Sequence, residues 1–358
     1  MCTSQFGRLG LLVFAASLYG CGSDEAQPPS DAGSDADAAL PVDASADVGP
    51  DATPDAGPPP SGAHWALAPK TAPFTARVEH SSVVLNGKMW VIGGLAVVGS
   101  NTKNANDVWS SSDGASWTQV TAAAPFVARS AHTSVVFNGK MWVIGGGDSN
   151  GHVYNDVWSS SDGITWAQAT AAAAFPARWL HTSVVFGGKM WVIAGTSSDS
   201  GSFGDLHDVW YSSDGSSWSA ATNAAAFDER DSHASVVFNS EMWSLVGTKR
   251  TGYTNEVWHS NDGATWGQTT TVPALALRDS HSSVVFDGSM WILGGLTATG
   301  RTNDVLRSSD GTNWTTVTTT APFTARAGHT SVVYDNTIWV IAGNAGGGTL
   351  SNDVWYAD

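Results

Sequence analysis

The hydrophobic positions of the chain recur in short runs, and residues typical of turns separate these runs. In one copy of the pattern, residues 132–137 are mostly β-branched or aromatic, an Asn-Gly pair follows, and residues 141–146 form a second apolar run that ends in two glycines. Because Asn-Gly supplies the positive φ angles of a tight turn, these runs predict a β-hairpin. A third run at 156–159 and a fourth that begins at Trp166 follow, with Ser-Asp-Gly between them. The pattern predicts four short strands in each copy.

The same pattern occurs six times, and an Arg-x-x-His segment opens each copy. The six segments are Arg77/His80, Arg129/His132, Arg178/His181, Arg230/His233, Arg278/His281 and Arg326/His329. The histidines are 52, 49, 52, 48 and 48 residues apart. This period is typical of propeller blades and longer than that of most helical repeats.

The two ends of the repeat region complement each other. The sixth copy stops at residues 353–358, where the other copies continue into Gly-x-x-Trp and a fourth strand. The missing piece, residues 62–65, stands before the first Arg-x-x-His. We therefore predict that the N-terminal strand completes the last blade, which closes the ring and removes a free sheet edge. The predicted fold class is all-β, a six-bladed β-propeller of four-stranded blades over residues 62–358.

Several repeated features resemble the Kelch repeat. They are the Gly-Gly that closes the second strand, the aromatic residue of the third strand and the Trp that opens the fourth. The resemblance covers about residues 62–358, and it departs from the Kelch pattern where Ala194, Val246 and Ala342 replace the first glycine. It implies a galactose-oxidase-like propeller. Kelch domains include enzymes and binding scaffolds, so the fold alone does not fix the function.

The N-terminal residues are typical of an exported protein. Residues 1–20 contain one basic residue, Arg8, and an apolar run at 9–18 that is too short for a stable membrane span. The Leu-x-Gly-Cys sequence that ends at Cys21 resembles a bacterial lipoprotein box, which implies that Cys21 is lipidated. Gly22 follows it, and in resembling proteins a residue other than Asp at this place favours the outer membrane. The alternative is an ordinary signal peptide with an incidental cysteine.

Residues 21–61 form a linker of different composition. Asp, Ala, Pro, Ser and Gly dominate it, and it carries nine acidic residues and no Lys or Arg. Such a segment cannot bury enough apolar surface to fold, and we expect an extended tether. The remaining residues 62–358 hold 15 basic and 23 acidic residues, a net charge of −8. This acidic balance without a basic run argues against nucleic acid as a partner and against electrostatic docking on anionic lipid.

The tryptophans occupy fixed places in the repeat. Seventeen of the 18 fall at positions of the second, third or fourth strands, where large rings are expected to fill the space between neighbouring blades. Trp179 is the exception, because it lies between Arg178 and His181.

Strand alternation predicts which face of the propeller binds ligands. The Arg-x-x-His segments and the loops between second and third strands emerge on the same face. These loops, taken as 95–105, 147–154, 196–206, 248–254, 296–302 and 344–351, vary most in length, and variable loops on a fixed scaffold often carry specificity. Residues that break the sixfold symmetry near this face are the candidates for ligand binding. The first set is Trp179, Arg77, Glu79, Arg178, Arg230, Asp231 and Asp279, and the second is Lys249, Arg250, Tyr253, Phe203 and His207.

The six histidines raise the question of a metal site. A residue repeated once in each blade is better explained by a structural role, such as an imidazole or guanidinium hydrogen-bonded to the backbone of an adjacent blade, than by a metal that needs about four convergent ligands. The only cysteines are Cys2 and Cys21, so the propeller contains no disulfide and no cysteine-ligated metal. We predict no metal and no cofactor. The Ser-Asp-Gly turns resemble the Asp boxes of sialidases, and each Asp is expected to cap its own turn.

The sequence leaves two classes of function open. We favour an envelope-anchored, monomeric binding module that presents its loop face to an unknown protein or glycan. The alternative is an exported carbohydrate enzyme that resembles the Kelch-type sialic acid mutarotases. In that case Arg77 and Glu79, or Arg230 and Asp231, would act on the hydroxyl of the opening ring. A copper oxidase resembling galactose oxidase is excluded in its known form, because the propeller has no cysteine for the Tyr-Cys crosslink.

Overall fold

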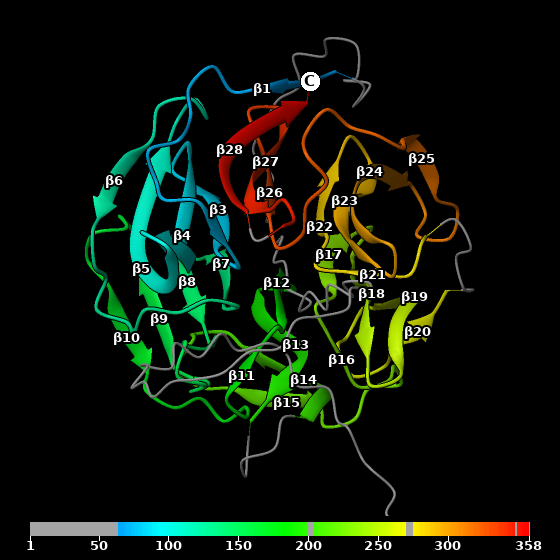
Figure 1. Cartoon of the computed structure of the whole chain (residues 1–358). Helices are drawn as coiled ribbons and strands as arrows, with labels where there is room; N and C mark the ends of the chain where they lie inside the picture. Colours follow the sequence, from blue (N-terminus) through cyan, green and yellow to red (C-terminus); the bar gives the residue numbers. More distant parts are fainter. Residues whose placement is uncertain (1–63, 199–203, 270–274, 348, 358) are drawn as a thin grey trace, which may run out of the picture. The chain divides into compact units, whose positions relative to one another are not determined.

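The computed structural model describes residues 64–198, 204–269, 275–347 and 349–357. The regular elements of these residues are β-strands, and none of the described segments forms a helix long and apolar enough to cross a membrane. The strands form six antiparallel sheets, which are the blades of a propeller (Figure 1). The predicted fold class is thus confirmed. The predicted signal segment, Cys21, the linker and Phe203 lie outside the described residues.

The blades follow one another along the chain, and the first strand of most blades is split in two. Blade 1 contains β2 (Arg77–Val78), β3 (Ser81–Leu85), β4 (Lys88–Val98), β5 (Asn101–Ser111) and β6 (Thr118–Thr121). Blade 2 contains β7 (Thr133–Phe137), β8 (Lys140–Ile144), β9 (Val157–Ser160) and β10 (Ala167–Thr170). Blade 3 contains β11 (Arg178–Trp179), β12 (Thr182–Phe186), β13 (Lys189–Ser197), β14 (Gly204–Ser212) and β15 (Ser219–Thr222).

The second half of the ring repeats this order. Blade 4 contains β16 (Arg230–Asp231), β17 (Ala234–Phe238), β18 (Glu241–Lys249), β19 (Gly252–Ser260) and β20 (Gly267–Gln268). Blade 5 contains β21 (Arg278–Asp279), β22 (Ser282–Phe286), β23 (Ser289–Thr297), β24 (Gly300–Ser308) and β25 (Thr315–Thr318). Blade 6 contains β26 (Thr330–Tyr334), β27 (Thr337–Asn344), β28 (Leu350–Ala357) and β1 (Trp65–Leu67).

Blade 6 is built from both ends of the propeller. β1 pairs antiparallel with β28, and Trp65 lies opposite Ala357 in the register. The N–H of Ala68 extends this pairing to the carbonyl of Val354 at 2.8 Å. The N-terminal strand therefore covers the outer edge of the last blade, as predicted, and ties the first part of the ring to the last.

The second and third strands are longer than the sequence pattern predicted. In blade 1, pairing continues past the glycine pair as far as Val98 opposite Asn101. The glycine pair lies at a β-bulge, where the register shifts between Ile92 and Gly94, and does not end the strand. The prediction of loops at 95–105, 248–254 and 296–302 is therefore wrong, because these segments are extended hairpins with two-residue turns. Strands also enter 196–206 and 344–351, whereas blade 2 keeps 147–154 as a connection between β8 and β9.

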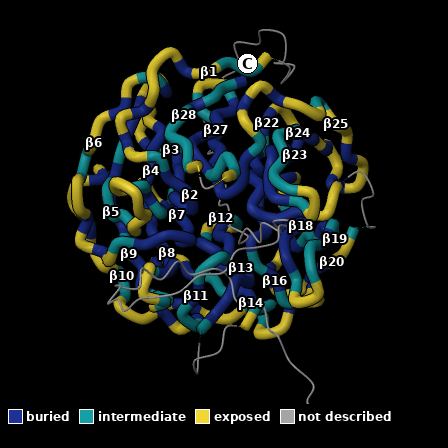
Figure 2. The backbone as a smooth tube through the Cα atoms, in the orientation of Figure 1, coloured by how far each residue is buried: buried dark blue, intermediate teal, exposed yellow. Residues whose placement is uncertain are grey.

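Tryptophans of the second strand set the distance between neighbouring blades. Trp90 of blade 1 is buried, and its ring lies against the Asp-Gly turn of blade 2, where a Cβ on Gly163 would stand 2.3 Å from the ring. The same contact joins Trp142 to Gly215 and Trp339 to Gly114. The buried apolar residues form clusters that combine residues of neighbouring blades. Figure 2 shows buried chain concentrated around the inner strands and exposed chain along outer strands such as β6 and β10.

Candidate functional site

A closed belt of backbone hydrogen bonds surrounds the propeller axis on the face that carries the Arg-x-x-His segments, here called the entry face. The residue before each histidine has a left-handed φ of 51–63° in all six blades. Its N–H donates to the carbonyl of the same position in the preceding blade at 2.9–3.2 Å, and the six residues are Glu79, Ala131, Leu180, Ser232, Ser280 and Gly328. These bonds hold the six entry segments in fixed positions relative to one another.

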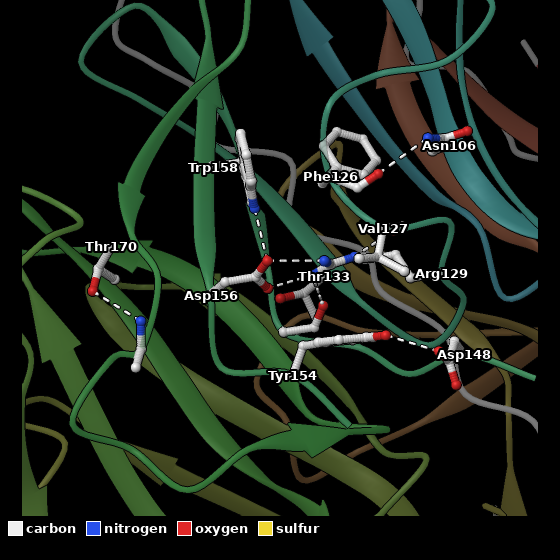
Figure 3. Close-up of polar contacts among 12 residues, drawn as sticks. Asn106, Phe126, Val127, Arg129, Thr133, Asp148, Tyr154, Asp156, Trp158 and Thr170 are labelled. Carbon is white, nitrogen blue, oxygen red and sulfur yellow. Dashed lines mark hydrogen bonds and ion pairs between the residues drawn. The ribbon is translucent and has the colours of Figure 1, made fainter. Parts of the chain in front are cut away.

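The repeat arginines lie inside their own blades. Arg129 donates from Nη1 and Nη2 to the two carboxylate oxygens of Asp156 at 2.6 and 2.9 Å, and from Nη1 to the carbonyl of Gly145 at 2.8 Å (Figure 3). The indole of Trp158 donates to the same carboxylate at 2.8 Å. Equivalent forks join Arg77 to Asp107, Arg178 to Asp208, Arg278 to Asp304 and Arg326 to Asp353. The sequence pattern suggested hydrogen bonds to the backbone of an adjacent blade. The guanidinium groups instead bind their own blade.

This arrangement places three of the predicted ligand-binding residues in the blade interior. The side chains of Arg77, Arg178 and Arg230 are fully buried. Burial alone would raise the pKa of Asp107, but the hydrogen bonds and the charge of Arg77 lower it below its usual value. These two arginines of regular blades, Arg77 and Arg178, thus have a largely buried carboxylate as counterion, which screens their charge from a ligand at the entry face.

The partners of the arginines were missed at the level of sequence. They belong to a third-strand motif 26–30 residues after each arginine, which is Asn-Asp-Val-Trp in blades 1, 2 and 6, His-Asp-Val-Trp in blade 3 and Asn-Asp-Val-Leu in blade 5. Asn106 of this motif donates to the carbonyls of Ala124 and Phe126, which fixes the connection to the next blade. The acid recurs before a Val-Trp or Val-Leu pair in the third strand of every blade, and this recurrence was the signal that could have identified the partners.

Blade 4 departs from this arrangement. Glu256 replaces the aspartate, and its longer side chain makes one contact to Arg230, from Nη2 to Oε2 at 2.8 Å. Its other oxygen accepts from Lys249 at 2.5 Å, and Lys249 also donates to Asp228. Nη1 of Arg230 is buried and has no hydrogen-bond partner among the described residues. The predicted residue Lys249 therefore belongs to this ion cluster, and Arg250 stands in the turn that follows.

Five of the six histidines connect neighbouring blades through a hydrogen bond of Nε2. His132 contacts the hydroxyl of Ser81 in blade 1 through Nε2 at 2.9 Å, and Ser81 also contacts Ser134 at 2.6 Å. Burial and the charge of Arg129 lower the pKa of His132 to about 3, so its imidazole is neutral. This geometry agrees with a structural role at the junctions, with a side-chain hydroxyl of the preceding blade as one partner. The described residues contain no group of three or more potential His, Cys, Asp or Glu metal ligands.

Acidic side chains gather at the entry face on some blades only. Burial raises the pKa of Glu79 to about 7, although Ser130 donates to its carboxylate at 2.6 Å. Loss of solvent around Asp231 raises its pKa well above the usual value, and the nearby Asp205 raises it further. Thr196 donates to both of these carboxyl groups, at 3.0 Å to Asp205 and 3.2 Å to Asp231.

The remaining predicted acid is also engaged within the structure. Asp279 is fully buried and accepts a hydrogen bond from Thr248 of the preceding blade at 2.5 Å. Thr196 and Thr248 hold equivalent positions on β13 and β18. Each threonine therefore links the second strand of one blade to the entry acid of the next, and the structure brings Asp231 and Asp279 into related environments.

Trp179 lies at the boundary between blades 2 and 3. The ring is half-buried and packs against the backbone of Gly147, where a Cβ would stand 2.8 Å from Cε3. Gly147 begins the connection 147–154. Asp148 folds this connection by accepting hydrogen bonds from Tyr154 (Figure 3) and from the backbone of His152. Trp179 thus lies beside the only described blade in which the second and third strands do not continue past the glycine pair. The other predicted residues, His207 and Tyr253, lie on β14 and β19.

Comparisons with known proteins agree with this architecture. Residues 181–358 match the family model described as the KLHDC2/KLHL20/DRC7 Kelch-repeats domain, and residues 79–211 match the DUF6242 beta propeller domain. A solved structure entitled "Structure of YjhT" superimposes with a TM-score of 0.65 at 18% sequence identity, and the match covers 80% of this chain and 96% of that chain. No curated protein shows significant similarity. The matches support a Kelch-type propeller fold.

Proposed function

We propose that the chain is a binding module that presents the entry face of its propeller to a glycan or protein partner. The observation that carries this proposal is the local asymmetry around Trp179. Five blades extend their central hairpins beyond the bulge, whereas blade 2 forms the short connection 147–154 next to the half-buried ring of Trp179. An aromatic ring next to the connection that carries Asp148 and Tyr154 is a suitable surface for a hydroxyl-rich ligand.

The charges of the entry face favour neutral ligands over acidic ones. In five blades the arginine is bound by two carboxylate oxygens of its own blade. Glu79 and Asp231 add carboxyl groups whose raised pKa values reflect surroundings that disfavour further negative charge. A ligand carboxylate would lose its hydration in the same surroundings, so a neutral sugar fits this surface better.

Ligand-induced thermal shifts test this proposal. Residues 62–358 are screened with neutral oligosaccharides, acidic sugars and divalent cations, and Trp179→Ala is compared with Ile164→Ala, which removes an exposed apolar side chain from a Ser-Asp-Gly turn. We expect a neutral sugar to raise Tm in the parent and in Ile164→Ala but not in Trp179→Ala. A shift that survives in Trp179→Ala contradicts the assignment of this surface.

The tether is part of the proposal. Lipidation of Cys21 and the acidic linker 21–61 would hold the propeller at a membrane, and the residue after Cys21 favours the outer membrane of a bacterial cell. Fractionation of cells that express the full chain tests this point. Cys21→Ser should move the protein from the membrane fraction to the soluble fraction, and a membrane-bound Cys21→Ser protein would argue against the anchor.

The second candidate is the mutarotase-like enzyme, and the observation that favours it is Glu79. A carboxyl group whose pKa is about 7 can both accept and donate a proton at neutral pH, which is what ring opening of a sugar requires. The fork between Arg77 and Asp107 weakens this candidate, because the proposed partner of Glu79 is already engaged. NMR of freshly dissolved sialic acid measures anomer interconversion directly. Acceleration that Glu79→Gln abolishes would replace the binding proposal with an enzymatic one.

A further inference from the structure

Five of the six blade junctions share one hydrogen-bonded contact. A Ser or Thr at the start of the first strand of one blade contacts both the histidine Nε2 and a serine hydroxyl of the next blade. The contacts are Ser81 with His132 and Ser134, Thr133 with His181 and Ser183, Thr182 with His233 and Ser235, Ser282 with His329 and Ser331, and Thr330 with His80 and Ser82. The distances are 2.8–3.0 Å to the imidazole and 2.5–2.7 Å to the serine.

The junction between blades 4 and 5 lacks the central hydroxyl. Ala234 occupies the position of the Ser or Thr. Nε2 of His281 and Oγ of Ser283 are fully buried, and neither atom has a hydrogen-bond partner in the described parts of the chain. Because a buried polar atom without a partner costs about 1–3 kcal/mol, such groups in folded proteins are commonly satisfied by an ordered water.

The spacing of this junction matches that of the others. The belt hydrogen bond from Ser280 to Ser232 is 3.1 Å long, within the range of the other belt bonds. On the outer side, the ring of Trp243 meets Gly311 as closely as its equivalents meet their glycines. Three of the other junctions accommodate a threonine, whose side chain is two heavy atoms larger than that of alanine. The junction at Ala234 therefore spans a comparable gap with a smaller side chain.

We propose that the junction between blades 4 and 5 is a binding site for one water molecule, held by Nε2 of His281 and Oγ of Ser283. The water takes the part of the missing hydroxyl and bridges the two blades. Burial and the charge of Arg278 lower the pKa of His281 well below its usual value, so the imidazole is neutral. Water can donate to Nε2 or accept from it, and both tautomers of the imidazole are therefore compatible with the site.

Two substitutions of Ala234 test the site, because a bound water predicts different changes in Tm for them. Ala234→Val has nearly the shape of threonine without the hydroxyl, so it should expel the water and leave His281 and Ser283 without partners. Ala234→Thr supplies the hydroxyl covalently. We expect Ala234→Val to lower Tm by about 2–6 °C and Ala234→Thr to leave it unchanged or raise it.

The opposite result would contradict the proposal. If the site is dry, valine fills an apolar gap, and Ala234→Val should raise Tm as much as Ala234→Thr. Thr182→Val is the matched control at an intact junction, and it should lower Tm because it removes the hydroxyl that His233 contacts. A crystal structure keeps the proposal testable if Ala234→Val does not fold. Density about 2.7–3.2 Å from both atoms is expected in the parent and not in Ala234→Thr, and its absence from the parent overturns the proposal.

Discussion

Blades 2 and 4 have the same strand order but satisfy their buried polar groups very differently. In blade 2, Arg129 makes hydrogen bonds to Asp156, Gly145 and Val127, and the hydroxyl of Thr133 reaches blade 3. In blade 4, Arg230 has one carboxylate contact and an unpartnered Nη1, and Ala234 carries no hydroxyl. A repeat therefore tolerates the loss of several hydrogen bonds in one copy while its backbone geometry persists.

The backbone persists because its determinants are separate from these side chains. The belt bond from Ser232 to Leu180 and the contact of Trp191 with Gly263 are both present around blade 4. Blade 4 also contains Ser244 at a strand position where the other blades have Val or Ile. Each of these departures from the repeat would lower stability, and they are concentrated in blade 4. The five regular blades and the closure of the ring maintain the fold.

The largest expected effect on stability comes from replacing Arg129 of blade 2, and it should exceed the effect of replacing Arg230 of blade 4. Arg129→Ala leaves the buried Asp156 without a counterion, and we expect a loss of about 3–5 kcal/mol in the free energy of unfolding. Arg230→Ala should cost clearly less, because Glu256 keeps its contact with Lys249. Urea unfolding of both variants measures the difference. Equal losses would show that the second cation of blade 4 does not compensate for the arginine.

The second glycine of the bulge should be indispensable in both blades. A Cβ at Gly146 would stand 2.6 Å from Cβ of His132, and a Cβ at Gly247 would stand 2.7 Å from Cβ of His233. Both glycines also have positive φ angles. We expect Gly146→Ala and Gly247→Ala each to cost about 2–5 kcal/mol from strain and overpacking. A loss below that range in Gly247→Ala alone would mean that blade 4 relaxes around the new methyl group.

The pH dependence of stability should distinguish paired from unpaired carboxyl groups. The pKa of Glu79 rises from 4.5 to about 7 on folding, so the folded state holds its proton more tightly than the unfolded state. Its ionisation therefore lowers stability as pH increases from about 4.5 to 7, by up to about 3 kcal/mol. Glu79→Gln should be more stable than the parent at pH 8 and similar to it at pH 4. Denaturant titrations at the two pH values provide the test, and a difference that does not vary with pH would contradict the raised pKa.

The smallest effect concerns the buried hydroxyl of Ser244. It has no hydrogen-bond partner among the described residues, and its side chain faces the same way as Met242, which packs in the cluster between blades 3 and 4. We expect Ser244→Val to raise the free energy of unfolding by about 1–2 kcal/mol. Val143→Ser makes the reverse change at the equivalent position of blade 2 and should be destabilising. If Ser244→Val were also destabilising, the hydroxyl would have an unseen stabilising contact.

The strand pattern could be predicted from local signals, but the bulge could not. In the sequence, a glycine pair after an apolar run indicates the end of a strand. In the structure, strand pairing resumes at Gly94 opposite Ala105. The difference between the two glycines also requires the tertiary structure. Ala194 and Val246 adopt the positive φ of the first position at some strain, whereas the second position lies too close to a histidine for any Cβ.

The sequence by itself determined the six blades, the closure of the ring by β1 and the identity of the residues that break the symmetry, because these follow from periodicity and from the complementary ends. Only the tertiary structure decided what the repeated polar residues do. Arg77 and Asp107 are 30 residues apart in the chain and 2.7 Å apart in space. His132 meets Ser81 across a blade junction. The first contact depends on the pairing of strands within one blade. The second depends on the distance between blades, which is set by packing around the whole ring and not by any segment alone.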